Sequence, residues 1–218
     1  MKNNTTDIKW SRCLIDIISD LTSNGVELKL TKNRRVFVPE EGTWVSGYCD
    51  EEDGRVVLAC GTQGDIEDWG TTLIHEYCHF LQWRERSPLW KAMDPIMAED
   101  FYNIITNKPV SKKDLDKCLI PSQNIEADCE RRVVKILKKY KIPIDTELYI
   151  KRANAYVYFY DHIRDYRKWY PKDKPPYMIK EIIDLCPKTF QKDYSKMPKK
   201  LKSVYSLVYP PVKNNRDL

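Results

Sequence analysis

The segment His75-Glu76-Tyr77-Cys78-His79 contains the residue types and the spacing from which metal-dependent chemistry is built. Residues four apart on an α-helix project from the same face, so the two imidazoles can bind one metal ion together. Glu76 directly follows the first histidine, where a carboxylate can take a proton from metal-bound water. The chain has only three histidines, and two of them stand in this segment. The pattern therefore predicts a zinc site with Glu76 as the general base.

A catalytic zinc ion needs a third protein ligand and leaves one coordination position open for water. The best candidate is Glu126, near the start of a predicted helix that follows later in the chain. Glu130 stands one turn further along the same face, where a carboxylate can orient a ligand histidine through its other ring nitrogen. In the competing interpretation, both glutamates are ordinary solvated charges that pair with Arg131 or Lys138.

Glu85 and Cys78 are the alternative third ligands. Glu85 could coordinate only if the motif helix turned back at Gln82, and no glycine stands there to make that turn easy. Cys78 projects within about 60° of His75 on the helical wheel, but its position favours core packing. A nucleophilic Cys78 activated by His79 is disfavoured because adjacent helical residues do not face each other.

His162 is the remaining histidine, and it stands in a segment rich in tyrosine. Several zinc peptidases use a histidine or a tyrosine to stabilise the oxyanion opposite the metal. His162, Tyr158 and Tyr160 are the candidates, and we assign His162 to this catalytic role. The alternative is an aromatic helix stripe that packs a core, with the histidine at its rim.

The elements that must position these residues form a sheet region followed by a helical majority. Apolar residues recur at helical spacing over 66–83, which places the motif on a helix. A second helix over 121–140 carries Glu126, a shorter one precedes it over 111–119, and a long helix covers 145–170. The strand patterns before the motif cover 26–30, 36–38, 43–48 and 55–60, with an Asp-Gly turn between the last two. The sequence therefore predicts an α+β fold, with a small, mostly antiparallel sheet packed beside a helical body.

The composition excludes several classes of protein. The 218 residues are 42% hydrophobic and 32% charged, with a net charge of +5, so the chain can bury a real core. Seven cysteines without a C-x-x-C pair indicate neither a disulfide framework nor a zinc ribbon. No apolar run approaches the roughly 18 residues of a membrane helix, and the N-terminus lacks the features of a secretory signal. We therefore expect a cytoplasmic protein with no membrane segment.

Two features of the predicted site resemble known enzyme families. The H-E-x-x-H helix with a downstream glutamate-bearing helix resembles the gluzincin branch of zinc metallopeptidases, and the resemblance covers residues 55–137. The string Glu-Ala-Asp at 126–128, followed by a helical apolar run, is similar to the ImmA/IrrE-type metallopeptidases. Those proteins carry glutamate–alanine–asparagine or glutamate–alanine–aspartate at this place.

The resemblance implies zinc-dependent hydrolysis of a peptide bond. It makes His75, His79 and Glu126 the zinc ligands and Glu76 the general base that deprotonates the attacking water. It also implies that the strand over 55–60 is the edge of the sheet, along which an extended protein or peptide substrate would lie.

The resemblance also suggests a division of the chain into two parts. We expect residues 1–170 to form a zincin-like metallopeptidase domain and residues 171–218 to form a basic helical extension packed on it. Between Lys188 and Lys202, six lysines stand against a single acidic residue. This stretch suits nucleic acid or an acidic partner, although such runs are usually solvated surface.

Two alternative functions stay open at this point. The scaffold could have lost turnover and act as a metal-stabilised binding or regulatory protein that uses its basic C-terminal part. The intact Glu76 argues against this, because a pure binder has no need of that carboxylate. The chain could also be a peptidase that acts on proteins bound to DNA, as in zincins with basic tails.

Overall fold

The structure, a computed structural model, describes residues 4–38, 42–52, 55–92, 103–104, 110–171 and 173–210. The chain packs as two units. The first consists of residues 1–87 and 129–144, and the second of residues 88–128 and 145–218. Helix α5 (Lys112–Lys139) contributes its first part to the second unit and its last part to the first.

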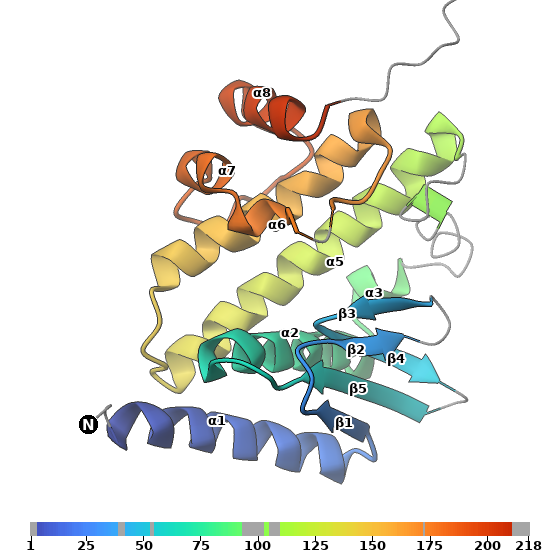
Figure 1. The fold of residues 1–218 in the computed structure, drawn as a ribbon. Helices are drawn as coiled ribbons and strands as arrows, with labels where there is room; N and C mark the ends of the chain where they lie inside the picture. The colour runs from blue at the N-terminus through green and yellow to red at the C-terminus, as the bar shows by residue number, and fades with distance from the viewer. Residues whose placement is uncertain are drawn as a thin grey trace, which may run out of the picture. The chain divides into compact units, whose positions relative to one another are not determined.

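The first unit contains a three-stranded sheet in the order β1-β5-β4 and a separate two-stranded sheet, β2-β3. The pairs β4-β5 and β2-β3 are antiparallel, whereas β1 runs parallel to β5. The strands are β1 (Glu27–Thr31), β2 (Val36–Val38), β3 (Thr43–Val45), β4 (Gly47–Glu52) and β5 (Arg55–Gly61). Together with the helices seen in Figure 1, they confirm the predicted α+β fold with a small, mostly antiparallel sheet.

Strand β5 is the central strand of its sheet, so the expectation that it forms the edge is wrong. Its residues after Arg55 are all buried, because β5 has a neighbour on each side and α2 packs on it. The parallel partner β1 comes from much earlier in the chain, and such a pairing leaves no local turn signal in the sequence. The two edges of this sheet are formed by β1 and β4.

Two helices of the first unit, α1 (Asn4–Ser23) and α2 (Ile66–Arg84), pack with this sheet. Helix α2 contacts β4 and β5, and α1 contacts α2 and β1 (Figure 1). Asp20 on α1 accepts a hydrogen bond from the Tyr77 hydroxyl at 2.7 Å and another from the Arg84 guanidinium at 2.9 Å. These bonds fix α2, which is the predicted motif helix, against α1.

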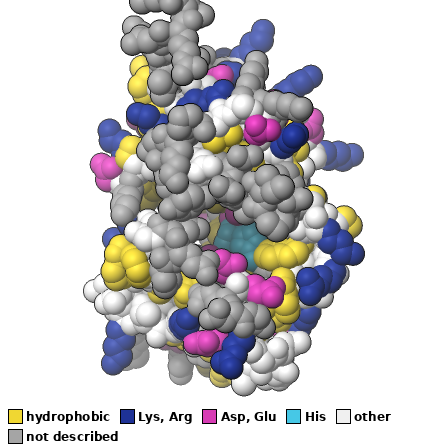
Figure 2. All heavy atoms as spheres, turned by 90° about the vertical axis from the view of Figure 1, so that its right-hand side faces the viewer, with side chains coloured by type: hydrophobic (Ala, Val, Ile, Leu, Met, Phe, Trp, Pro, Cys, Tyr) yellow, Lys and Arg dark blue, Asp and Glu magenta, His cyan; other side chains and the backbone are white. Residues whose placement is uncertain are grey.

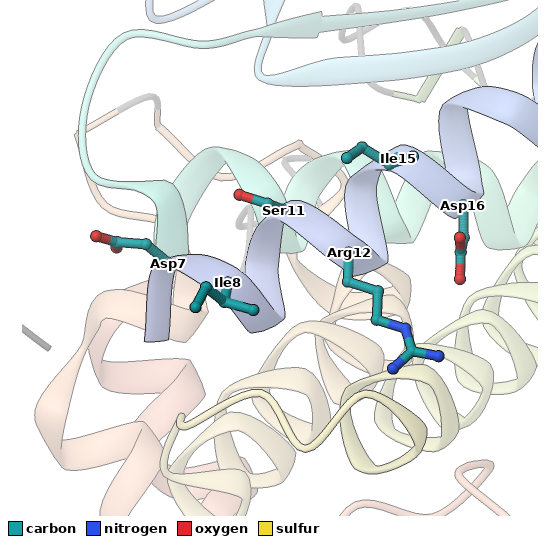
Figure 3. A pocket seen from close by; sticks show the side chains of 6 residues that line it. All are labelled: Asp7, Ile8, Ser11, Arg12, Ile15 and Asp16. Carbon is teal, nitrogen blue, oxygen red and sulfur yellow. The ribbon is translucent and has the colours of Figure 1, made fainter. Parts of the chain in front are cut away.

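The outward side of α1 forms a shallow depression. Figure 3 shows the side chains that line it, which are Asp7, Ile8, Ser11, Arg12, Ile15 and Asp16. Ile8 and Ile15 are well exposed there. None of the predicted site residues lies in this depression, so it is not the predicted site.

The second unit is built around α6 (Thr146–Tyr166) and has an aromatic core. The ring of Phe159 lies 5.2 Å from that of Tyr170, 5.3 Å from that of Tyr209 and 5.5 Å from that of Trp169, measured between centroids. The other helices described in this unit are α3 (Pro88–Lys91), the 3-10 helix η1 (Pro176–Met178), α7 (Lys180–Leu185) and α8 (Lys199–Val208).

Buried amides connect the C-terminal segment to the helices of this unit. Gln123 donates hydrogen bonds to the carbonyl oxygens of Val157 and Tyr194, at 3.0 and 3.3 Å. Asn154 donates to the carbonyl oxygen of Pro187 at 2.8 Å. The unit therefore holds residues from both sides of position 170. The division into residues 1–170 and an extension stays a prediction.

Helix α5 is continuous where two helices were expected, over 111–119 and 121–140. Pro121 lies inside it. A proline lacks the backbone N–H of the helical hydrogen-bond ladder and normally interrupts a helix. Here the Ser122 hydroxyl donates to the carbonyl oxygen of Cys118 at 2.8 Å and supplies an extra bond beside the gap.

Candidate metal centre

Helix α2 brings the two motif histidines together on one face, as their spacing requires. Leu73, Ile74 and Cys78 are fully buried, so this side of the helix forms core and leaves His75 and His79 on a half-buried side. The Nε2 atoms of the two imidazoles lie 3.1 Å apart, and the rings meet edge to face at 79°. The full burial of Cys78 confirms its expected packing role.

Each motif histidine has an oxygen acceptor at its Nδ1 atom. The Glu130 carboxylate lies 3.2 Å from Nδ1 of His75, as predicted for the residue that orients a ligand histidine. The side-chain oxygen of Gln82 lies 2.9 Å from Nδ1 of His79. An amide oxygen and an ionised carboxylate can only accept hydrogen bonds, so both Nδ1 atoms carry the proton. A neutral imidazole protonated at Nδ1 has its lone pair on Nε2.

The two Nε2 lone pairs thus face each other across 3.1 Å. Two lone pairs at this distance repel each other unless a cation, either a metal ion or a proton, lies between them. Two nitrogens at ~2.0–2.1 Å from one tetrahedral zinc ion are about 3.3 Å apart. The spacing and the donor chemistry of this pair therefore fit zinc.

Cys129 is the third residue that the structure groups with the motif. One potential ligand atom from each of His75, His79 and Cys129 lies within 4.8 Å of the others. The Cys129 thiol is fully buried, lies 3.5 Å from Nδ1 of His75 and donates to the His75 carbonyl oxygen at 3.3 Å. Sequence reasoning missed Cys129, although a cysteine directly before Glu130 offers a favoured zinc ligand.

Gln82 is a second residue beside the histidine pair that sequence reasoning missed. Its position three residues after His79 places it on the same face of the helix, which was the available signal. Its side chain is completely buried. A buried amide with a fixed partner can hold an imidazole in one orientation more strictly than a solvated one can.

Glu126 belongs to the second unit, and its role as third ligand stays a prediction. Within that unit it lies close to the phenol groups of Tyr156 and Tyr170. Burial, followed by the nearby Glu126 carboxylate, raises the pKa of Tyr156 well above its ordinary value. The hydroxyls of Tyr156 and Tyr160 lie 3.1 Å apart.

Glu76 lies on a side of α2 that packs against the sheet. Its side chain is only 8% exposed. At Gly47 of β4, a Cβ atom would lie 3.0 Å from Cγ of Glu76, so the missing side chain lets the helix approach the strand closely. Burial, and next the Glu76 charge, raise the pKa of Cys60 to about 12 and that of Cys49 further. Glu76 thus lies near the antiparallel pair β4-β5, beside the edge strand.

Glu85 lies apart from the histidine pair. Its carboxylate forms an ion pair with Arg132 at 2.9 Å, which links the C-terminal end of α2 to the last part of α5. This geometry supports the view that Glu85 is a charge-paired residue and not a ligand.

His162 lies in the core of the second unit, where an oxyanion could not readily reach it. Its side chain is 1% exposed, and Nε2 donates to the carbonyl oxygen of Tyr209 at 2.8 Å. The rings of Tyr166 and Tyr205 pack on it at 5.7 and 5.4 Å. Burial lowers the pKa of His162 below its ordinary value. These contacts favour a packing role over the catalytic role predicted for it.

Histidine reaches the molecular surface at the motif. Figure 2 shows histidine surface in cyan, with acidic side chains in magenta close to it. Because His162 is buried, this surface belongs to the motif pair. The side chain of His75 is 19% exposed. The pair is thus accessible to water and to a ligand.

No protein-family model, curated protein or solved structure matches the chain. None of the helices in the described ranges combines the length and the apolar character needed to cross a membrane. A functional proposal therefore depends on the residues of the candidate metal centre themselves.

Proposed function

We propose that this chain is a zinc-dependent peptidase. The observation that supports the proposal best is the pair of Nε2 atoms at 3.1 Å, with both Nδ1 atoms held by oxygen acceptors. A helix that carries Glu76 between these two histidines joins a metal-binding pair to a potential base within one turn.

The proposed roles follow from the positions of the side chains. His75 and His79 would hold zinc through Nε2, with Glu126 as the predicted third ligand and Cys129 as the alternative. Bound zinc would lower the pKa of a coordinated water toward about 7. The Glu76 carboxylate would take the proton of that water and deliver it to the leaving amine of a peptide.

The surroundings of Glu76 suit this transfer. Its carboxylate is almost fully buried beside β4 and β5, where burial raises the pKa of neighbouring thiols. A buried carboxylate that can reach a metal-bound water is suited to act as its general base. Gln82 and Glu130 would keep the two rings in place during the reaction.

The test compares three forms of the full chain. Wild type, the double variant His75→Ala/His79→Ala and Glu76→Gln are purified, loaded with zinc, analysed for metal and incubated with a mixed peptide library. We expect about one zinc per chain in wild type and in Glu76→Gln, and none in the double variant. Only wild type should cleave peptides, with Glu76→Gln slower by several orders of magnitude. Zinc in the double variant, or wild-type cleavage by Glu76→Gln, would overturn the proposal.

The alternative of a silent binding protein that uses the basic C-terminal stretch has less support. Lys188 and Lys202 form ion pairs with Glu147 and Asp165, at 2.8 and 2.9 Å. The tyrosines in and next to that stretch that could stack on a base, at positions 194 and 205, are buried. The lysines there are thus partly neutralised and have no exposed tyrosine beside them.

A further inference from the structure

A second surface of the first unit combines positive charge with exposed aromatic rings. It is formed by the bend after β1 and by the hairpin strands β2 and β3, and we call it the cationic–aromatic surface. Its residues are Lys32, Arg34, Arg35, Phe37 and Trp44.

The aromatic part is a cross-strand pair. Phe37 on β2 and Trp44 on β3 are direct partners in the antiparallel register, with ring centroids 5.4 Å apart. They are 44% and 48% exposed, whereas Val36 and Val38 on the other face of β2 are buried. Adjoining exposed apolar side chains of this kind can mark a binding site.

The cationic part is held in place by backbone contacts. Thr62 donates to the carbonyl oxygen of Thr31 at 2.8 Å, and Gln63 donates to that of Asn33 at 3.2 Å. At Gly61, a Cβ atom would lie 2.6 Å from the backbone of Arg34, so the bend packs directly on the end of β5. The charges therefore start from a fixed backbone, which lowers the entropy cost of binding.

The three cations keep their charges available. Lys32 and Arg34 are exposed and Arg35 is half-buried. Across the part of the chain that the structure describes, no carboxylate forms an ion pair with any of the three. This differs from the C-terminal stretch, where Lys188 and Lys202 are both paired.

We propose that the cationic–aromatic surface binds single-stranded nucleic acid. Phosphates would contact Lys32, Arg34 and Arg35, and one or two unpaired bases would stack on Trp44 and Phe37. The carboxylates of an acidic peptide would use the cations but could not stack on the aromatic pair, whereas every nucleotide supplies both a phosphate and a flat base. A duplex keeps its bases stacked on each other, and the pair could not reach their faces.

The test measures fluorescence anisotropy of a labelled single-stranded oligothymidine with the full chain, over a range of salt concentrations. In wild type we expect binding that weakens with salt. Trp44→Leu should weaken it about tenfold, because leucine keeps the apolar bulk but cannot stack, whereas Trp44→Tyr should nearly restore it. Arg34→Ala/Arg35→Ala should weaken binding and reduce the slope of log affinity against log salt by about 1.4.

A matched control separates this surface from general charge attraction. Lys199→Ala/Lys200→Ala removes the same charge from exposed residues of α8 and should leave binding unchanged. Melting curves show whether each variant is folded.

Four outcomes would overturn the proposal. The first is the absence of binding by folded wild type. The second is equal binding by Trp44→Leu and wild type, and the third is displacement by an equal charge concentration of polyglutamate, because either would indicate an acidic partner held by charge alone. The fourth is an equal loss in the α8 control. Glu76→Gln should bind like wild type, so the result is independent of the proposed peptidase.

Discussion

Gln82 and Glu130 determine which ring nitrogen of each motif histidine carries a proton, and therefore which nitrogen can bind a metal. Their oxygen atoms lie 2.9 and 3.2 Å from the two Nδ1 atoms. We expect Gln82→Leu to lower zinc affinity about 10–100-fold, because the His79 ring loses the acceptor that orients it. Gln82→Glu keeps an oxygen in place and should retain most of the affinity. Competition with a chromophoric zinc chelator measures both, and an unchanged affinity in Gln82→Leu would contradict the assigned role.

The identity of the third zinc ligand also depends on single residues, Glu126 or Cys129. Glu126→Ala should lose most of the bound zinc, whereas Cys129→Ser should keep it, because the Cys129 thiol already donates to the His75 carbonyl oxygen. Cobalt replacement of zinc distinguishes the two donors, since a thiolate ligand adds a sulfur-to-cobalt charge-transfer band that a carboxylate lacks. A band that is present in wild type and absent in Cys129→Ser would make the cysteine the ligand.

Short spacings within one helix predicted the site residues best. The four-residue spacing of the histidines and the position of Glu130 were readable because helical geometry fixes which side chains share a face. Cys129 and Gln82 were not recognised, since their importance depends on which histidine nitrogen they meet after packing. His162 was given a catalytic role because aromatic neighbours look alike in sequence whether they line a cleft or fill a core.

At the scale of elements, the close packing of α2 on β4 depends on a residue without a side chain. In Gly47→Ala, the new Cβ atom would lie 2.9 Å from Cγ2 of Thr72 and 3.0 Å from Cγ of Glu76. We expect the free energy of unfolding to fall by ~1–3 kcal/mol, because the helix must move off the strand. Urea unfolding measures the change, with Ser46→Ala at the exposed neighbouring position as the control. Equal stability of the two variants would mean that the contact can relax at no cost.

The elements themselves were predicted where local signals specify them. The motif helix and the β4-β5 hairpin follow from helical periodicity and from an Asp-Gly turn. The parallel pairing of β1 with β5 was not predicted. In the described sequence, the strands β2, β3 and β4 lie between the two partners, so no local signal joins them. The continuity of α5 through Pro121 was also missed. Helix propensities do not include the hydrogen bond that the Ser122 hydroxyl forms next to the missing backbone N–H of Pro121.

At the scale of the whole molecule, the buried His162 makes stability depend on pH. Burial lowers its pKa from an ordinary value of 6.5, so between the two values the unfolded chain binds the proton more readily than the folded chain. The contribution of neutral, buried His162 to the free energy of unfolding is therefore complete above about pH 6.5 and decreases as the pH falls below that value. His162→Gln can still donate to the Tyr209 carbonyl oxygen but does not titrate. Urea unfolding at about pH 7.5 and about pH 5.5 should show a smaller difference in this variant than in wild type. An equal difference would refute the assignment.

None of the seven cysteines forms a disulfide, so their alkylation can be used to measure unfolding of the chain. Burial raises the pKa of Cys13, Cys60 and Cys186 to about 12, so almost no thiolate is present at neutral pH while the chain is folded. Alkylating reagents attack the thiolate, and an unfolded thiol returns to a pKa of about 8.5. The number of alkylated cysteines per chain, read by mass spectrometry, should therefore rise steeply at the urea midpoint and stay near zero for these three below it. Rapid native labelling would reveal local opening that leaves the rest of the fold intact.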